Sequence, residues 1–230
     1  MNEKTSFAGA AAIVVAAAIL AVGMANITKT DRSVSVRGLA EREVAADMAV
    51  WPLSFTLGGN NLATLQQTIS DKTAVATQFL QEHGLEPSDF TVQAPAITDN
   101  SVNPYMDKNQ ISYIYIAKAT ILVRSDKVLE VKNAQADSMA LMSSGIAVSQ
   151  DYSSKISFEF TKLNDIKPDM IADATQNARL AAEQFARDSG SKVGKIKRAT
   201  QGLFSIEDAA VGLEEKKNVR VVTTVEYALK

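Results

Sequence analysis

The stretch Y113-I-Y-I-A-K-A-T-I-L-V-R-S-D-K127 decides the fold class of this chain. Apolar side chains recur at every second position from Ile111 to Val123, which is typical of a β-strand. Ile114, Ile116 and Leu122 occupy intervening positions, so we expect both faces of this strand to be partly covered. The polar residues that end the stretch suit the start of a helix.

Apolar residues at helical spacing predict three helices, each followed by a glycine. Asn61 caps the first helix, Ser125 and Asp126 cap the second, and Pro168 suits the first position of the third. The predicted helices and the glycines that end them are 62–83 with Gly84, 127–143 with Gly145, and 168–189 with Gly190. The third helix carries a narrow apolar stripe of Ile171, Ala174, Ala178, Ala181 and Phe185, whose small residues let a helix lie close to a sheet.

Alternating apolar residues also predict strands on either side of these helices. Trp51, Leu53, Phe55 and Leu57 share one face of such a strand, and Pro52 within it indicates an edge, a bulge or a bend. The remaining expected strands are 34–36, 90–97, 156–160, 193–200 and 219–227, and residues 98–110 and 203–218 are expected to be loops. Strands and single helices in this order predict an α+β fold, with three helices packed on one or more largely antiparallel sheets.

The N-terminus predicts attachment to a membrane or export across one. The 19 residues from Phe7 to Ala25 carry no charge and would span roughly 28 Å as a helix, close to the thickness of a bilayer core. The length favours an uncleaved signal anchor, and a signal peptide cleaved near Ala25 is the alternative. We therefore expect an N-terminal segment of residues 1–29 and an α+β domain of residues 30–230, on the outer side of the cytoplasmic membrane.

Composition excludes several classes of site. The chain has no cysteine and a single histidine, so thiol nucleophiles, zinc–thiolate sites and multi-histidine metal sites within one chain are excluded. Its net charge of −2 argues against a nucleic-acid-binding protein, since such proteins show a basic excess. We expect no cofactor and no bound metal.

The stretch G190-S-K-V-G-K-I-K-R198 looks like a phosphate-binding loop. A Walker loop has the form G-x-x-x-x-G-K-[ST] between a strand and a helix, whereas here the spacing is one residue short and Ile196 replaces the hydroxyl residue. The predicted order is also reversed, because a helix precedes the stretch and a strand follows it. Gly190 is better explained as a helix end, and Lys192 as a cation that complements the helix dipole.

Four other groups are candidate functional sites. Each has a structural explanation that we favour, so we expect no catalytic residues. His83 suits the end of a helix, and Glu41 and Glu43 suit ion pairing in a strand that also carries Arg37 and Arg42. The other two groups are Lys195, Lys197 and Arg198, expected on a solvated strand edge, and Tyr105, Tyr113 and Tyr115, expected to pack but able to line a groove with loop 98–110.

Three segments together resemble the SIMPL-domain (DUF541) family. They are V34-S-V-R-G-L-A-E-R-E-V-A-A-D-M-A-V-W-P-L-S-F55, the stretch 113–127, and D173-A-T-Q-N-A-R-L-A-A-E-Q-F-A-R-D-S-G-S-K-V-G-K-I196. The apolar segment before R37-G-L-A-E-R-E-V44 resembles the membrane-anchored branch of this family. The resemblance implies a periplasm-facing envelope protein linked to tolerance of oxidative and other envelope stress. Some members of the family form ring-like homo-oligomers, so we expect this protein to be a homo-oligomer. It supplies no catalytic residues.

These observations lead to one main expectation and two alternatives. We expect a non-enzymatic envelope protein that acts as an oligomeric scaffold or protective factor. The first alternative is a binding module for a small ligand or an envelope polymer, with the tyrosine group and loop 98–110 as its site. The second is a hydrolase that uses acidic residues such as Glu41 and Glu43.

Overall fold

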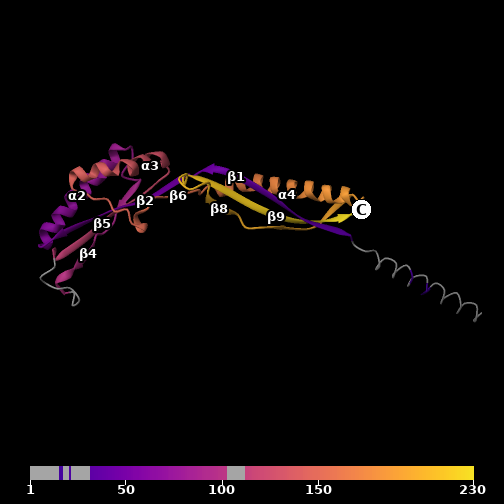
Figure 1. Cartoon of the computed structure of the whole chain (residues 1–230), viewed down its shortest axis with the longest axis horizontal. Helices are drawn as coiled ribbons and strands as arrows, with labels where there is room; N and C mark the ends of the chain where they lie inside the picture. Colours follow the sequence, from indigo (N-terminus) through magenta and orange to yellow (C-terminus); the bar gives the residue numbers. More distant parts are fainter. Residues whose placement is uncertain (1–15, 18–20, 22–31, 103–111) are drawn as a thin grey trace, which may run out of the picture. The chain divides into compact units, whose positions relative to one another are not determined.

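The computed structural model describes residues 16–17, 21, 32–102 and 112–230. These residues form two compact units (Figure 1). The central unit consists of residues 41–169 and 204–220, and the terminal unit consists of the described residues up to 40 together with 170–203 and 221–230. The long strands β1 (Ser33–Ala45) and β9 (Lys216–Leu229) contribute residues to both units.

The central unit is built on a five-stranded antiparallel sheet. Its order is β3 (Phe90–Val92), β5 (Tyr115–Ser125), β2 (Met48–Gly59) and β6 (Ser157–Glu159), and β4 (Ala96–Asp99) also pairs with β5. The register of β2 and β5 places Leu53 opposite Ile121. The predicted central strand is therefore confirmed, and the strand expected over 90–97 is two shorter strands.

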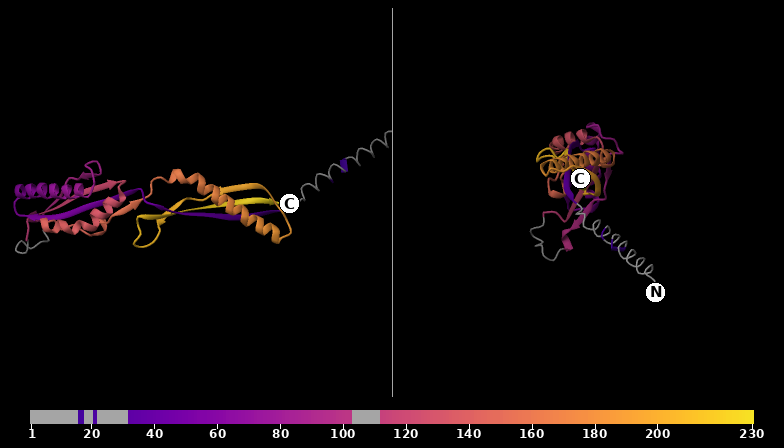
Figure 2. Two further views of the ribbon diagram at one scale, coloured as in Figure 1. Left: turned by 90° about the horizontal axis from the view of Figure 1, so that it is seen from above. Right: turned by 90° about the vertical axis from the view of Figure 1, so that its right-hand side faces the viewer.

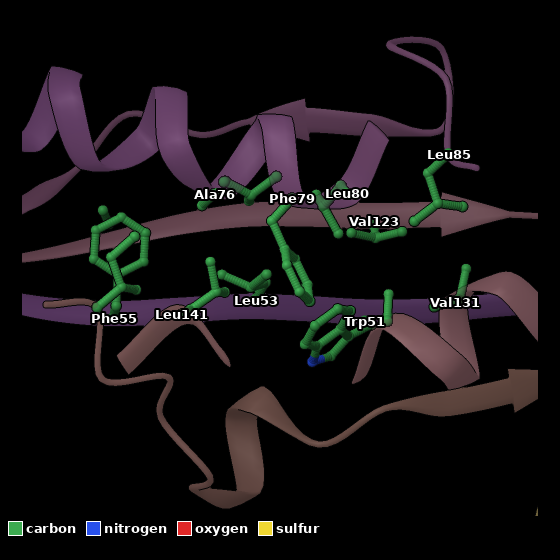
Figure 3. Packing of buried hydrophobic residues seen from close by; sticks show 14 of the residues in the cluster. Trp51, Leu53, Phe55, Ala76, Phe79, Leu80, Leu85, Val123, Val131 and Leu141 are labelled. Carbon is green, nitrogen blue, oxygen red and sulfur yellow. The ribbon is translucent and has the colours of Figure 1, made fainter. Parts of the chain in front are cut away.

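Helices and 3-10 turns cover the apolar face of this sheet. They are α2 (Leu62–Glu82), α3 (Val128–Asp137) and the 3-10 helix η2 (Ser138–Ser144). Trp51, Leu53 and Phe55 of β2 belong to one core cluster with Leu80 and its neighbours on α2 (Figure 3). All four side chains are at most 2% exposed, so the alternating pattern of β2 supplies the floor of a core made of large side chains.

Local capping fixes the start of α2 and the ends at Gly84 and Gly145 as the sequence predicts. The Asn61 side chain accepts a hydrogen bond of 3.1 Å from the Thr64 N–H at the start of α2. Gly84 and Gly145 have φ of +85° and +70°, which favours glycine. The following residues Leu85 and Ile146 are buried, and their N–H groups donate back to Leu80 and Leu141.

The second helix differs from the prediction. The helix expected over 127–143 is α3 followed by the 3-10 helix η2, and no side chain caps its start, because the Ser125 hydroxyl accepts its hydrogen bond from the Lys127 N–H before the first turn.

Pro52 lies at an open stretch of the edge of β2. Strand β6 pairs only with Met48–Val50. Farther along, the Ser54 carbonyl accepts a hydrogen bond from Ser149 rather than from β5. Because backbone groups alternate along an antiparallel strand, the Pro52 nitrogen faces the same side as Ser54 and disrupts no pairing with β5. The predicted edge position is confirmed.

The second sheet has the order β1, β9 and β7 (Val193–Gln201), and β8 (Ser205–Asp208) also pairs with β9. Backbone hydrogen bonds from Leu229 to Arg32 and from Ala46 to Glu215 show that β1 and β9 run antiparallel. Helix α4 (Leu163–Asp188), orange in Figure 2, lies along the sheet in the terminal unit. Its Ala178 and Ala182 pack against Val36 of β1 and against Val225 and Tyr227 of β9.

Helix α4 approaches β1 closely because both contact surfaces are small. Its buried residues follow a strict four-residue spacing of Met170, Ala174, Ala178, Ala182 and Ala186. On the sheet side, a Cβ atom added to Gly38 would overlap the carbonyl oxygen of Ala174 and the backbone nitrogen of Ala178. Gly38 is therefore required by close backbone contact rather than by a turn.

Three sequence-based expectations for this region were wrong. Helix α4 begins at Leu163, so Pro168 lies inside the helix rather than at its first position. Phe185 is 60% exposed, because the buried face follows Ala182 and Ala186 instead of Ala181 and Phe185. The expected loop 203–218 contains β8 and the start of β9, which form an antiparallel pair.

The predicted membrane segment Phe7–Ala25 lies, apart from residues 16–17 and 21, outside the described residues. None of the helices in the described parts of the chain is long and apolar enough to cross a membrane.

Candidate functional site

The single histidine has the structural role that the sequence predicts. His83 follows the last turn of α2 as its C-cap. Its Nδ1 lies 2.8 Å from the Phe79 carbonyl oxygen, and its Nε2 lies 3.3 Å from Asp137 Oδ2. Because both ring nitrogens contact the ends of helices, His83 serves local structure.

The two carboxylates that are candidates for a catalytic pair each lie beside a cation. Glu41 and Glu43 extend from β1 toward β9, where Arg220 Nε lies 3.3 Å from Glu41 and Lys216 Nζ lies 3.0 Å from Glu43. The predicted cross-strand ion pairing is confirmed. In the described part of the chain, His, Cys, Asp and Glu form no group of three that could hold a metal ion.

The structure describes two of the three tyrosines that are candidates for a ligand site. Tyr113 is half exposed, and its ring lies against Gly58, where an added Cβ would overlap it. Tyr115 is half-buried and packs against the core of the central unit. Tyr105 and most of loop 98–110 lie outside the described residues. For Tyr113 and Tyr115 the packing interpretation is therefore confirmed.

The stretch 190–198 is a junction between α4 and β7. Gly190 has a φ of +65°, and the Ser191 N–H donates to the Ala186 carbonyl at 2.8 Å. These features confirm the predicted helix end. Gly194 then lies against β9, where an added Cβ would be 2.9 Å from the Ala228 oxygen. Lys195 and Arg198 follow on β7 and are exposed.

A cavity that the sequence does not predict lies beside Trp51. Its volume is about 260 Å³, and its lining includes Trp51, Gln135 of α3, and the segment 148–156. A bridge between Phe55 and Val148 and a 2.7 Å hydrogen bond from Ser149 N–H to the Ser54 oxygen hold this segment beside β2. The cavity therefore lies between Trp51 of β2 and a polar connecting segment.

Asp151 fixes the shape of that segment. It accepts a 2.7 Å hydrogen bond from Ser153 Oγ and lies 3.3 Å from Lys118 Nζ of β5. The hydrogen bond from Ser153, together with the nearby Ser154 hydroxyl and the Lys118 charge, lowers the pKa of Asp151 to about 2. Asp151 is therefore ionised at neutral pH and anchors the short 3-10 helix η3 (Tyr152–Ser154).

A second cavity adjoins the first and has a volume of about 360 Å³. Tyr152, Lys155 and Ile156 line both cavities. The second also contains the ion pair between Lys217 and Asp208, in which Lys217 is buried. The segment around Tyr152 thus borders two adjacent hollows.

The sequence carries few signals for this site. Trp51 is the only tryptophan in the chain, but it falls in a strand pattern that predicts core packing. Residues 150–155 form a polar segment whose composition is typical of a loop. The two parts lie about a hundred residues apart, so only the fold brings them together.

One family profile matches most of the chain. The profile of the SIMPL family, described as a protein of unknown function (DUF541), matches residues 34–227. The chain belongs to the SIMPL family. The match includes both compact units and every strand and helix described above from β2 to β8. No curated protein matches the SIMPL chain.

Proposed function

We propose that this SIMPL protein is a non-enzymatic component of the cell envelope that assembles with copies of itself. The observation that supports assembly is strand β7. It ends the order β1–β9–β7, and its residues 195–201 are exposed on both faces. An unpaired edge of this kind is a template for another strand.

The charges on β7 favour a selective contact over uncontrolled pairing. Lys195, Lys197 and Arg198 make this edge basic, while the whole chain has a net charge of −2. Lysine at an edge discourages non-specific strand addition, and complementary charge on a partner removes that penalty. A second copy, whose surface carries the excess acidic residues, is the partner we propose. No nucleic acid is expected to bind.

Light scattering coupled to size exclusion tests this assembly. The full chain in detergent, and a chain that begins at residue 30, should both have masses above that of a monomer. The double variant Lys195→Glu/Arg198→Glu should dissociate, because it opposes the proposed acidic partner surface without disturbing the core. A matched control, Arg32→Glu/Arg124→Glu, reverses two exposed charges outside β7 and should retain the wild-type mass. Monomeric wild-type protein at high concentration would contradict the proposal.

The proposed location is the periplasmic side of the cytoplasmic membrane, with Phe7–Ala25 as a single-pass anchor. The length and lack of charge of this segment support the anchor. Mass spectrometry of the mature protein checks it, since an anchored chain begins at or next to Met1 and a cleaved chain begins near Asn26.

Membership in the SIMPL family and the resemblance to its anchored branch support a role in oxidative or envelope stress. Loss of the gene should then increase sensitivity to peroxide, and the full chain should restore tolerance.

The cavity beside Trp51 favours a second candidate function, a binding module for a small ligand or an envelope polymer. Its volume of about 260 Å³ is close to the lower end of small-molecule pockets. A thermal-shift screen of envelope metabolites checks this role, and stabilisation by none of them would count against it.

A further inference from the structure

Two exposed methionines lie three residues apart on the 3-10 helix η2. Met139 is 68% exposed and Met142 is 59% exposed. Residues three apart on a 3-10 helix are eclipsed, so both side chains leave the same side of η2. Because most of each side chain is exposed, burial in the core does not account for the pair.

The other methionines that the structure describes are less accessible. Met48 on β2 is half-buried, and Met170 on α4 is 1% exposed. The chain has no cysteine, so methionine thioethers are its only sulfur groups. An oxidant in solution that reacts with sulfur therefore reaches Met139 and Met142 before it reaches Met48 or Met170.

The fold around η2 is held by other groups than these two side chains. Leu141 lies between them and is buried in the core, and its carbonyl accepts a hydrogen bond from the Ile146 N–H. Lys72 Nζ donates to the Ser144 carbonyl oxygen at 2.6 Å. Oxidation converts methionine into a polar sulfoxide, which water solvates at an exposed position. The same change at Met170 would place a polar group in the apolar contact of α4.

We propose that Met139 and Met142 form a reversible oxidation site, which consumes two equivalents of a peroxide while the protein stays folded. At each thioether the sulfur lone pair forms an S–O bond as the O–O bond of the peroxide breaks. The leaving hydroxide takes the proton of the transferred oxygen, which yields the sulfoxide and water. A thiol-dependent methionine sulfoxide reductase reverses the change, since two thiols become a disulfide and the oxygen leaves as water.

This site goes beyond the assembly proposed above. Helix η2 belongs to the central unit, whereas β7 belongs to the terminal unit. Loss of assembly in a β7 variant would leave the exposure of both thioethers unchanged. The two proposals can therefore fail separately.

Peptide mass spectrometry measures the oxidation at each position. The full chain, in a peroxide-free detergent, is treated with hydrogen peroxide, stopped with catalase at intervals and digested with trypsin. Met139 and Met142 lie on one tryptic peptide, 133–155, and its fragment ions separate them, whereas Met48 and Met170 lie on other peptides. We expect peptide 133–155 to gain two oxygens at least about tenfold faster than Met170 gains one, because a buried thioether reacts only after local opening, and an opening free energy of about 1.4 kcal/mol already gives a factor of ten.

Two further measurements test whether the oxidation is tolerated and reversible. Protein oxidised at both positions but not at Met170 should unfold at the same urea concentration as the untreated protein. Treatment with methionine sulfoxide reductases for both sulfoxide epimers, with dithiothreitol as electron donor, should restore the original mass of peptide 133–155.

Met139→Leu/Met142→Leu keeps the apolar character of both positions and removes the thioethers. Peptide 133–155 of this variant should gain no oxygen, and its unfolding should match the wild type. Met170→Leu is the matched control, because it removes a buried thioether and should leave the rapid oxidation of peptide 133–155 unchanged. The proposal is overturned if Met139 and Met142 react no faster than Met170, if their oxidation lowers the urea concentration of unfolding, or if the reductases leave the sulfoxides in place.

Discussion

The two compact units bury different kinds of side chain. The central unit packs large residues such as Trp51, Leu53 and Phe55 between a sheet and α2. The terminal unit packs the alanines of α4 against β1 and β9, with Gly38 at the closest approach. Large side chains stabilise mainly by the apolar area that they bury, at about 25 cal/mol per Å². Small ones allow close backbone packing, so the terminal unit should be more sensitive to added volume than to removed volume.

Removal of a large side chain from the central unit should have the largest effect. Phe55 is 0% exposed, and Phe55→Ala should lower the free energy of unfolding by about 3–5 kcal/mol through lost burial and the cavity that remains. Urea unfolding followed by Trp51 fluorescence measures this effect within the central unit itself. Phe185→Ala is the control, because Phe185 is exposed and its loss should change stability by less than about 0.5 kcal/mol. A small effect of Phe55→Ala would contradict the view that large buried side chains stabilise the central unit.

Addition of a single methyl group should have the next largest effect, in the terminal unit. In Gly38→Ala the new Cβ meets backbone atoms of α4, which cannot rotate away, so helix and strand must separate. We expect a loss of about 2–3 kcal/mol, even though alanine is intrinsically better than glycine in a strand. Circular dichroism at 222 nm detects this loss because α4 is the longest helix described.

Gly212→Ala is the control for Gly38→Ala, because it measures the cost of backbone strain without steric overlap of the added Cβ. Gly212 has a φ of +85°, and an added Cβ there has no neighbour within 4 Å, so the variant should lose only about 1 kcal/mol. If Gly38→Ala proves no more harmful than Gly212→Ala, the close packing of α4 on β1 contributes little to stability.

A smaller effect is expected when a buried alanine of α4 loses its methyl group. Ala182→Gly should cost about 1–2 kcal/mol, because it combines the lower helix propensity of glycine with the loss of one buried methyl. Ala172→Gly, at an exposed position of the same helix, measures the propensity alone and should cost about 1 kcal/mol. Equal losses in the two variants would show that Ala182 adds nothing by packing.

Sequence patterns predicted those parts of the fold that local chemistry decides. Gly84 and Gly145 were identifiable because a left-handed residue that follows an apolar helix favours glycine. The alternation in β2 and β5 was identifiable because one face is buried from Ala49 to Phe55 in β2 and from Ala117 to Ser125 in β5. The family resemblance came from the same segments and is confirmed by the match over residues 34–227.

The errors arose where a distant residue decides the local structure. The start of α4 was misplaced because Asp47, which lies in another part of the sequence, accepts hydrogen bonds from the Thr161 and Lys162 N–H groups just before the helix. Burial raises the pKa of Asp47, but these hydrogen bonds outweigh it and the net pKa is lowered. Similarly, the Trp51 cavity depends on the packing of segment 148–156 beside β2, which no spacing in the sequence specifies.

The smallest predicted effect concerns the wall of that cavity and its response to acid. The pKa of Asp151 is lowered to about 2, so the contacts of its carboxylate stabilise the folded segment fully above the ordinary pKa near 4 and are lost as the pH falls through about 2. Ser153→Ala removes the largest cause of this shift, and the pKa of Asp151 should rise toward its ordinary value. The acid-induced change in Trp51 fluorescence should then begin at a higher pH than in the wild type.

Ser143→Ala is the control, because it removes an exposed hydroxyl that is hydrogen-bonded to the Ala140 carbonyl and should leave the curve of fluorescence against pH unchanged. Coincident curves for Ser153→Ala and the wild type would mean that Asp151 does not shape the cavity, and that only the packing of the central unit holds segment 148–156 in place.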